Sequence, residues 1–330
     1  MQTIRHRLAA GALSFMLLGM TATSMAQSGA GAFPTRPVTI IVPFAPGGAV
    51  DLECRMYSPG LSAALGQSAV IDYKPGAGTT LGAGYVAKSK PDGYTVLANS
   101  TGLTVAPAFY KDLSYDLQKD LVPITLMSKQ HSMISVSPSF PAKTLVEYLA
   151  YARANPGKIN YGTAGAGAIS HLAGAWMHAL SNTQVTFIHH KGTGPLLLEL
   201  QAGRVDVGTG LLIATVPMAN AGKIRPLAVM GTERSSQLPN LPTVAEQGVP
   251  GFDYTSWIGF LTTGGTPAAI VSRLNDAFVK TVKSPAIVAQ LEKQGSVAVG
   301  SNPEQFRQHI ATELVRWKKV VIDASLKLEE

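Results

Sequence analysis

The chain has 330 residues, a formal net charge of +7, 14% charged residues, 33 glycines and a single cysteine. At roughly 100–200 residues per domain, this length suffices for two domains with cores of their own. The apolar fraction of 46% is ordinary for a globular protein, which argues against extensive disorder and against a coiled coil. Because Cys54 stands alone, an internal disulfide framework and a cysteine-based zinc site are excluded.

Residues 1–26 have the pattern of a secretory signal peptide. A basic start precedes the apolar stretch Leu8–Met20, and the small residues Ser24 and Ala26 occupy the −3 and −1 positions of a cleavage site. The alternative, a membrane anchor, needs about 20 apolar residues, and this stretch is shorter. We therefore predict cleavage after Ala26 and a soluble, exported mature protein.

The positive charge is spread thinly along the chain. No run of lysine and arginine interleaved with aromatic residues is present, so we predict no nucleic-acid partner. A diffuse positive potential favours a small anionic ligand instead.

Apolar β-branched runs alternate with helical patterns. The predicted strands are 38–42, 69–73, 94–98, 158–161, 205–207 and 227–230, and the predicted helices are 50–65, 144–154, 169–180, 195–201 and 267–282. Alternating strands and helices predict parallel sheets, whose ligand sites lie beyond the carboxyl ends of the strands.

Four glycine-rich loops, 43–48, 74–80, 161–171 and 190–194, each lead into a predicted helix. In such loops the uncovered backbone N–H groups and the positive end of the helix dipole face the same place. Glycine is common in connecting loops whatever their function, so one such loop alone would be only a connector. Four of them with almost no charged residues predict an anion receptor that needs no arginine.

The glycine spacings favour a carboxylate over a nucleotide phosphate. Segments 76–81 and 165–170 lack the third glycine of the dinucleotide fingerprint, and no Gly-Lys-Ser/Thr follows for a P-loop. Neither a Gly-x-Ser-x-Gly elbow nor a His-Glu-x-x-His motif is present. We therefore predict a binding protein without cofactor or metal, and not an enzyme.

Histidines and one aspartate need separate interpretations. His171 and His178 share a helix face, but no acidic or cysteine partner is near in sequence, so packing or capping is favoured over metal binding. His189 and His190 point to opposite faces of an extended segment, and we expect His190 to line the cleft. Asp51 has a competing role as a favourable charge in the first turn of a helix.

Motifs spread over the whole mature chain carry a resemblance to a known family. They are Arg36-Pro37, 38–48 (V-T-I-I-V-P-F-A-P-G-G), Asp51, 74–78 (K-P-G-A-G), 91–95 (P-D-G-Y-T), 155–162 (N-P-G-K-I-N-Y-G), 170–174 (S-H-L-A-G) and 241–246 (L-P-T-V-A-E). In this order they resemble the Bug/TctC family, the periplasmic solute-binding proteins of tripartite tricarboxylate transporters. The resemblance implies a type II periplasmic-binding-protein (Venus-flytrap) α/β fold, with two lobes, crossover hinge strands and a carboxylate between the lobes.

The implied lobes are 27–128 with 252–330, and 129–251, with hinges around 126–136 and 252–261. The family holds its ligand mostly with backbone amides, hydroxyls and ordered waters. Carried over position by position, the implied ligand-binding residues are Phe44, Ala45, Gly47, Gly48, Gly78, Thr79, Thr80, Thr163, Ala164, Gly165, Gly167, Ala168, Ser170, His171, His190, Lys191 and Thr209. At the hinge, His131 and Ser132 are candidates for the edge of the cleft.

The chain departs from the family pattern at two places. The family often has Pro-Tyr where this chain has His189-His190, and it often has an acidic residue, which meets an amino acid's ammonium group, where 207–210 reads V-G-T-G. We therefore expect a ligand without an amino group: an aliphatic dicarboxylate, or an aromatic mono- or dicarboxylate such as terephthalate or another phthalate. His190 or Lys191 would meet its distal carboxylate.

The expected protein is a periplasmic carrier that closes around its ligand and delivers it to inner-membrane transporter subunits, without forming a stable oligomer. The alternatives are a ligand-binding component of a signalling system and an exported enzyme acting on a carboxylic acid. The first has the same pocket, and the second would need a catalytic set that the motifs do not supply.

Overall fold

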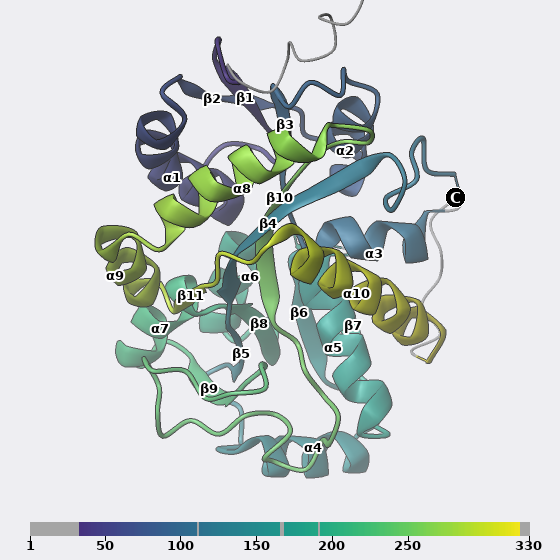
Figure 1. Ribbon diagram of the computed structural model, residues 1–330. Helices are drawn as coiled ribbons and strands as arrows, with labels where there is room; N and C mark the ends of the chain where they lie inside the picture. The colour runs from purple at the N-terminus through teal and green to yellow at the C-terminus, as the bar shows by residue number, and fades with distance from the viewer. Residues whose placement is uncertain (1–32, 111, 166–167, 191, 324–330) are drawn as a thin grey trace, which may run out of the picture.

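The computed structural model describes residues 33–110, 112–165, 168–190 and 192–323. Two α/β lobes, each built around one sheet, lie one above the other (Figure 1). The predicted signal peptide, Gly167 and Lys191 lie outside the described residues. No helix in the described ranges is long and apolar enough to cross a membrane.

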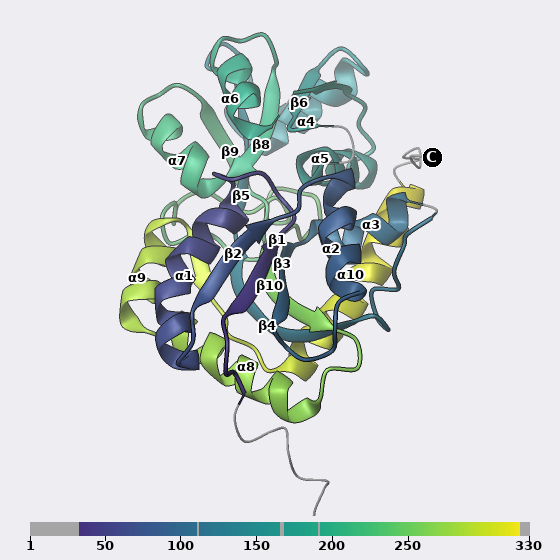
Figure 2. The ribbon, with the colours of Figure 1, turned by 90° about the horizontal axis from the view of Figure 1, so that it is seen from above.

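The first sheet is covered by helices on both faces. Its six strands run in the order β11 (Ser296–Ala298), β4 (Leu121–Gln130), β10 (Ser256–Thr263), β3 (Thr95–Ser100), β1 (Val38–Val42) and β2 (Ala69–Tyr73). On β1, Ile40 packs on the side of α1 (Ala49–Leu65) and α8 (Ala268–Val282), whereas Ile41 packs on the side of α2 (Thr80–Ala87) and α10 (Pro303–Asp323). Figure 2 shows α1 and α2 on opposite sides of the strands. Burial on both faces explains the unbroken apolar run of β1.

The second sheet repeats this arrangement. Its five strands run in the order β7 (Thr186–His189), β6 (Asn160–Thr163), β8 (Val207–Leu211), β5 (Ser132–Val136) and β9 (Arg225–Val229). Ile134 of β5 packs with α4 (Leu145–Ala154) and α5 (Ile169–Leu180), and its neighbour Met133 packs with α6 (Thr193–Gln201) and α7 (Leu212–Asn220). Each lobe is therefore a three-layer unit with its own core.

The chain passes between the lobes at two places. β4 ends at Gln130 in the first sheet and β5 begins at Ser132 in the second, so only His131 separates them. The return follows β9 and enters the first sheet at β10. The two-lobed α/β architecture with crossover strands is confirmed, and we keep 27–128 with 252–330, and 129–251, as the proposed limits of the lobes.

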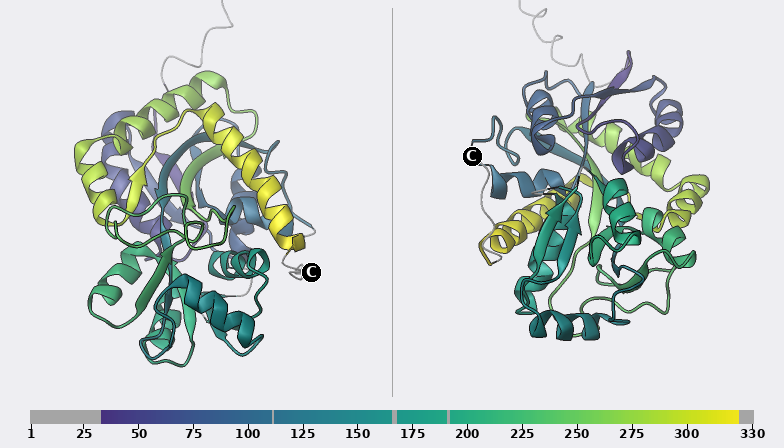
Figure 3. Two further views of the ribbon diagram at one scale, coloured as in Figure 1. Left: turned by 90° about the horizontal axis from the view of Figure 1, so that it is seen from below. Right: turned by 180° about the vertical axis from the view of Figure 1, so that it is seen from behind.

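Two further contacts join the lobes away from the crossovers. α10 runs from the first lobe toward α5 (Figure 3), where Trp317 packs on Trp176 with ring centroids 6.2 Å apart. Elsewhere, the Gln237 side-chain amide donates to the carbonyl oxygens of Glu292 and Lys293, at 3.1 and 2.8 Å. These two residues are at the end of α9 (Pro285–Lys293), so a segment of the second lobe caps a helix of the first. The remaining helices are α3 (Gly102–Phe109) and the short 3₁₀ turn η1 (Ala77–Thr79).

Two expectations from the sequence are corrected. The sheets are mixed: β1 is parallel to β2 and β3, but β10 is antiparallel to both β3 and β4, and β5 is antiparallel to β8 and β9. The reason is topological, because β4 leaves the first lobe and β10 returns to it. The strand predicted at 205–207 is β8, which starts at Val207 and continues through Gly208 and Gly210. A Cβ on Gly210 would lie 2.8 Å from Thr215 Cγ2, so close packing explains a residue that propensity disfavours in strands.

A stability prediction follows from Gly259 in β10. A Cβ at this position would lie 2.3 Å from Cζ of Phe306, a fully buried ring of α10. We expect Gly259→Ala to destabilise the protein by about 1–3 kcal/mol through overpacking, measured by urea unfolding. The matched control is Gly194→Ala, at an exposed helical position where no atom lies within 4 Å of the added methyl group. The free energy of unfolding of this variant should equal that of the wild type or be slightly higher. Equal stability of Gly259→Ala and the wild type would contradict the packing argument.

Candidate functional site

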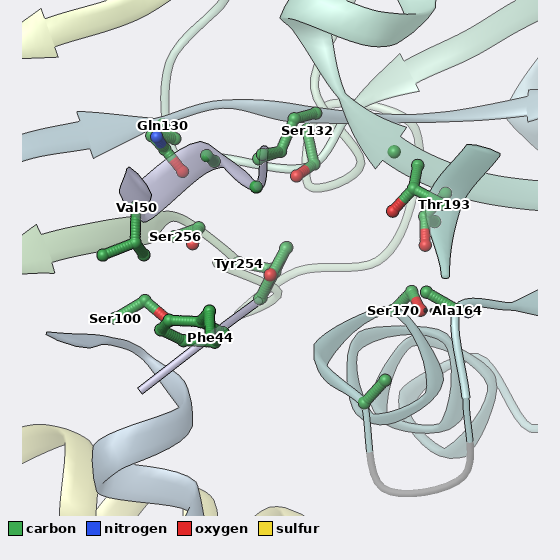
Figure 4. A pocket seen from close by; sticks show the side chains of 16 residues that line it. Phe44, Val50, Ser100, Gln130, Ser132, Ala164, Ser170, Thr193, Tyr254 and Ser256 are labelled. Carbon is green, nitrogen blue, oxygen red and sulfur yellow. Dashed lines mark hydrogen bonds between the residues drawn. The ribbon is translucent and has the colours of Figure 1, made fainter. Parts of the chain in front are cut away.

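A cavity of about 260 Å³ lies between the lobes. Figure 4 shows Phe44, Val50 and Ser100 reaching it from the first lobe, and Ser170 and Thr193 from the second. The crossovers supply its middle wall, with Gln130 and Ser132 from the outgoing chain and Tyr254 and Ser256 from the returning chain. The first lobe, the second lobe and the crossovers between them therefore all contribute to the wall of the cavity.

Four helices begin at this cavity. Ala49 in α1, Ala168 before α5, Thr193 in α6 and Leu211 before α7 all line it. None of these four helices has a side-chain hydrogen bond from its N-cap residue to the first turn. Their first N–H groups lack intrahelical partners, and their dipoles add positive potential at the same place. This arrangement favours a bound anion.

The glycine-rich loop before α1, residues 43–48, is fixed by Asp51. Its carboxylate accepts hydrogen bonds from the Gly47 N–H at 2.7 Å, the Tyr73 hydroxyl at 2.7 Å and Arg55 Nε at 2.9 Å. Burial raises the pKa of Asp51, but the hydrogen bonds from Gly47, Tyr73 and Arg55 outweigh it and leave the pKa below its usual value. Asp51 thus stays ionised and orients the loop that places Phe44 and Gly48 at the cavity.

Thr163 makes hydrogen bonds within the third glycine-rich loop, which precedes α5. This buried hydroxyl donates to the Gly165 carbonyl at 3.2 Å and lies 2.6 Å from His189 Nδ1. The Ser170 hydroxyl accepts a hydrogen bond from the Ala164 N–H at 2.8 Å. These bonds set the path of the loop, so that Ala164, Ala168 and Ser170 line the cavity.

A buried carboxyl supports the crossover. Glu53 of α1 accepts hydrogen bonds from the Tyr57 hydroxyl at 2.5 Å, the Ser128 hydroxyl at 2.6 Å and Gln130 Nε2 at 2.7 Å. Burial raises the pKa of Glu53, and the three donors only partly counter it. The bond to Gln130 fixes one amide of the cavity wall to α1, the helix whose N-terminus also lines the cavity.

The lining offers neutral donors in place of charges. Among the described residues that form it there is no aspartate, glutamate, lysine, arginine or histidine, and its side-chain hydroxyls belong to Ser100, Ser132, Ser170, Thr193, Thr209, Tyr254 and Ser256. In the described part of the chain, no three histidine, cysteine or acidic side chains are grouped so that they could hold a metal ion. Backbone N–H groups, helix dipoles and hydroxyls are groups that can bind an anion without a charged side chain.

The structure gathers some of the predicted site residues at this cavity. Phe44, Gly48, Ala164, Ala168, Ser170 and Thr209 line it, and Gly47 lines an adjoining cavity. Ala45 is exposed beside Phe44, while Gly165 and Thr163 shape the third loop without lining the cavity. Their roles in binding stay predictions.

The second glycine-rich loop, 74–80, does not line the main cavity. Gly78 has a φ of 57° and no room for a Cβ, which would be 2.6 Å from the Tyr110 hydroxyl. Asn99 Nδ2 donates to the Thr79 hydroxyl at 3.4 Å, and the Thr80 hydroxyl donates to the Ala77 carbonyl at 2.8 Å. Thr80 lines a different cavity, beside α2. Contact of this loop with a ligand is therefore left as a prediction.

The predicted histidines also lie outside the lining. His171 packs on the rings of Phe187 and His189, with centroids 4.6 and 4.8 Å away. Burial, and secondarily the neighbouring His189, lowers the pKa of His171 to about 4. The backbone N–H of His190 donates to the Thr163 carbonyl at 2.9 Å, and its side chain does not line the cavity.

Four residues of the lining are absent from the set expected from the sequence: Ser100, Gln130, Tyr254 and Ser256. Ser100 was accessible to reasoning, since it ends the strand β3 at the carboxyl edge where ligands bind. The other three lie on the crossovers, and no local motif marks them. Ser132 was expected at the edge of the cleft and does line the cavity.

Two lobes, two crossovers and a cavity between helix N-termini define the fold class of periplasmic binding proteins. The chain belongs to the TctC family, described as the tripartite tricarboxylate transporter family receptor, whose model matches residues 54–326.

Known proteins of the same kind cover nearly the whole chain. A UPF0065 protein from the tcbD-tcbE intergenic region of Pseudomonas sp. (strain P51) is 36% identical over 99% of this chain and 96% of its own. The structure of R. palustris Rpa4515 with adipate has a TM-score of 0.80 and 34% identity, covering 89% of this chain and 98% of that chain. MatC (Rpa3494) from Rhodopseudomonas palustris with bound malate has a TM-score of 0.77 and 31% identity, covering 88% of this chain and 100% of that chain.

His178 provides a test of the packing interpretation. Its Nε2 lies 3.1 Å from the Tyr148 hydroxyl and its Nδ1 lies 2.6 Å from the Thr183 hydroxyl, inside the second lobe. These bonds and the burial of the side chain give His178 a role in packing. Burial lowers the pKa of His178 to about 3, so the native state resists protonation that the unfolded chain accepts.

Neutral His178 contributes to the stability of the folded protein. This contribution is complete above about pH 6.5, the pKa of the histidine in the unfolded chain, and it is lost as the pH falls toward 3. We expect the wild type to lose stability relative to His178→Gln by about 1.4 kcal/mol per pH unit below pH 6.5. Urea unfolding of both proteins between pH 4 and about pH 8 measures this difference. Parallel pH profiles would contradict the prediction.

Proposed function

We propose that this protein is a periplasmic receptor that captures a small carboxylate between its lobes and delivers it to a membrane transporter. The observation that carries the proposal is the cavity at which four uncapped helices begin and whose described lining has hydroxyls but no charged side chain. A carboxylate matches this wall because its charge is spread over two oxygens, each able to accept hydrogen bonds from N–H and O–H donors.

The relatives support the same ligand class. Adipate in Rpa4515 and malate in MatC are both dicarboxylates held by proteins that share this fold and about a third of this sequence. The described lining of the main cavity contains no acidic side chain that would meet an ammonium group. We therefore propose a ligand without an amino group, an aliphatic dicarboxylate or an aromatic carboxylate. His190 and Lys191, the expected partners of a distal carboxylate, are not among the described residues that line the cavity, so their role stays a prediction.

Binding couples to closure of the lobes. A ligand that touches both walls binds the closed arrangement more tightly than the open one and shifts the population toward it. Charge-assisted hydrogen bonds contribute about 1.5–3 kcal/mol each, so about four of them support a Kd near 1 μM after the costs of ordering. The proposed role is capture and release, and not turnover of the ligand.

Calorimetry with the purified protein tests the ligand class. We expect one or more of succinate, malate, adipate, terephthalate and benzoate to bind, and we expect aspartate and glutamate to bind at least tenfold more weakly than the best of them. A thermal-shift screen finds the ligand first, since a millimolar concentration of a micromolar ligand adds about 4 kcal/mol of stability. Binding of glutamate or aspartate as tight as that of any dicarboxylate would contradict the absence of an amino group.

A matched pair of variants tests the wall itself. Thr193→Val removes a hydroxyl at the start of α6 and keeps the shape, so we expect carboxylate affinity to fall about five- to tenfold. Thr312→Val makes the same change at an exposed position on α10, where the hydroxyl donates to the Gln308 carbonyl, and should leave affinity unchanged. Equal affinities for wild type and Thr193→Val would remove this hydroxyl from the site.

Transport and location are tested together in cells. We expect deletion of the gene to abolish high-affinity uptake of the carboxylate identified by calorimetry, and the full chain to restore it. A chain lacking residues 2–26 should stay in the cytoplasm and fail to restore uptake. Unchanged uptake in the deletion strain would contradict delivery to a transporter and would favour a signalling role.

A further inference from the structure

The main cavity adjoins a second one. This second cavity, of about 470 Å³, shares Gly48, Ala49, Gln130, Thr193 and Leu211 with the first. The shared residues include the starts of α1 and α6, so both spaces meet where the helix N-termini point. A ligand whose carboxylate lies at these N-termini has room to continue into the second cavity.

Beyond the shared wall, the second cavity is lined by apolar side chains from both lobes. Leu52 comes from α1 in the first lobe, and Ile213 and Ala214 come from α7 in the second. Leu52 is 47% exposed and Ile213 is 41% exposed, although both are large and apolar. Two exposed apolar side chains that line one cavity from opposite lobes form a surface for the hydrocarbon part of a ligand.

The second cavity also has polar lining residues, and its described lining has no carboxylate without a hydrogen-bond partner. His131, Gln294 and Ser296 line it. Glu53 lines it as well, but its two carboxyl oxygens already accept hydrogen bonds from Tyr57, Ser128 and Gln130. A polar group at the distal end of a ligand would therefore meet neutral hydrogen-bonding partners there.

We propose that this second cavity receives the apolar body of an elongated carboxylate whose head group lies at the helix N-termini of the main cavity. The ligand class is narrowed to acids with an apolar body between or beside their carboxylates, namely longer alkanedioates and aryl carboxylates. Leu52 and Ile213 contact this body from opposite lobes, so ligand length contributes to selectivity. This inference rests on the proposed carboxylate-binding function and deepens it.

The test compares long and short ligands in variants of the second cavity. Calorimetry gives the affinities for succinate, adipate, suberate and terephthalate. For the wild type, we expect the best of the last three to bind at least tenfold more tightly than succinate. Ala214→Phe fills the second cavity from an exposed helical position that does not line the first, so we expect it to lower this long-to-short ratio at least tenfold.

A second variant and a control make the result specific. Ile213→Ser keeps the space but removes an apolar wall, and should lower the ratio about three- to tenfold. Ala221→Phe introduces the same ring at an exposed position just after α7 that lines neither cavity, and should leave the ratio unchanged. Thermal unfolding shows that each variant is folded before its affinities are compared.

The outcomes separate this inference from the proposed function. A lower long-to-short affinity ratio in Ala214→Phe and Ile213→Ser supports this inference. The affinities for adipate, suberate and terephthalate then show whether an alkyl chain or an aromatic ring occupies the second cavity. A wild type that prefers succinate, or variants with unchanged ratios, overturns the second cavity as a ligand site while carboxylate binding stands. If no carboxylate binds the wild type, both the proposed function and this inference are overturned.

Discussion

The organising constraint of this structure is that four helices direct the N–H groups of their first turns, which have no intrahelical partner, to one place. α1, α5, α6 and α7 begin at one cavity, and none is capped by its own N-cap side chain. Groups of this kind need water, protein or a ligand as a hydrogen-bond partner. In the proposed function, a carboxylate held between the lobes would be this partner.

The loops before these helices contain many glycines, yet buried polar side chains fix their paths. Asp51 bonds the Gly47 N–H, and Thr163 bonds Gly165, each behind the wall that it supports. Glu53 connects α1 to Gln130 on the crossover. A wall held in this way is preorganised, so less order has to be imposed when a ligand binds.

A receptor made of backbone groups and hydroxyls recognises a carboxylate without reading the rest of the molecule. Discrimination among carboxylic acids must then come from the shape and polarity of the surrounding wall. Within this family, Rpa4515 is known with adipate and MatC with malate, acids that differ in length and in hydroxylation. In this chain we propose that the adjoining cavity beside Leu52 and Ile213 is where such differences act.

Local patterns in the sequence determined most of the elements and the kind of chemistry. The apolar run Val38–Val42 predicts a buried strand, and the glycine loops before the helices predict anion binding without arginine. These features depend on neighbours in the chain. Tertiary structure alone decided which glycine-rich loops converge. The first, the third and, through Thr193, the fourth line the cavity, whereas Thr80 of the second lines another. It also brought Gln130, Tyr254 and Ser256 to the site, because strand order and crossovers, which no local pattern encodes, set what lies side by side.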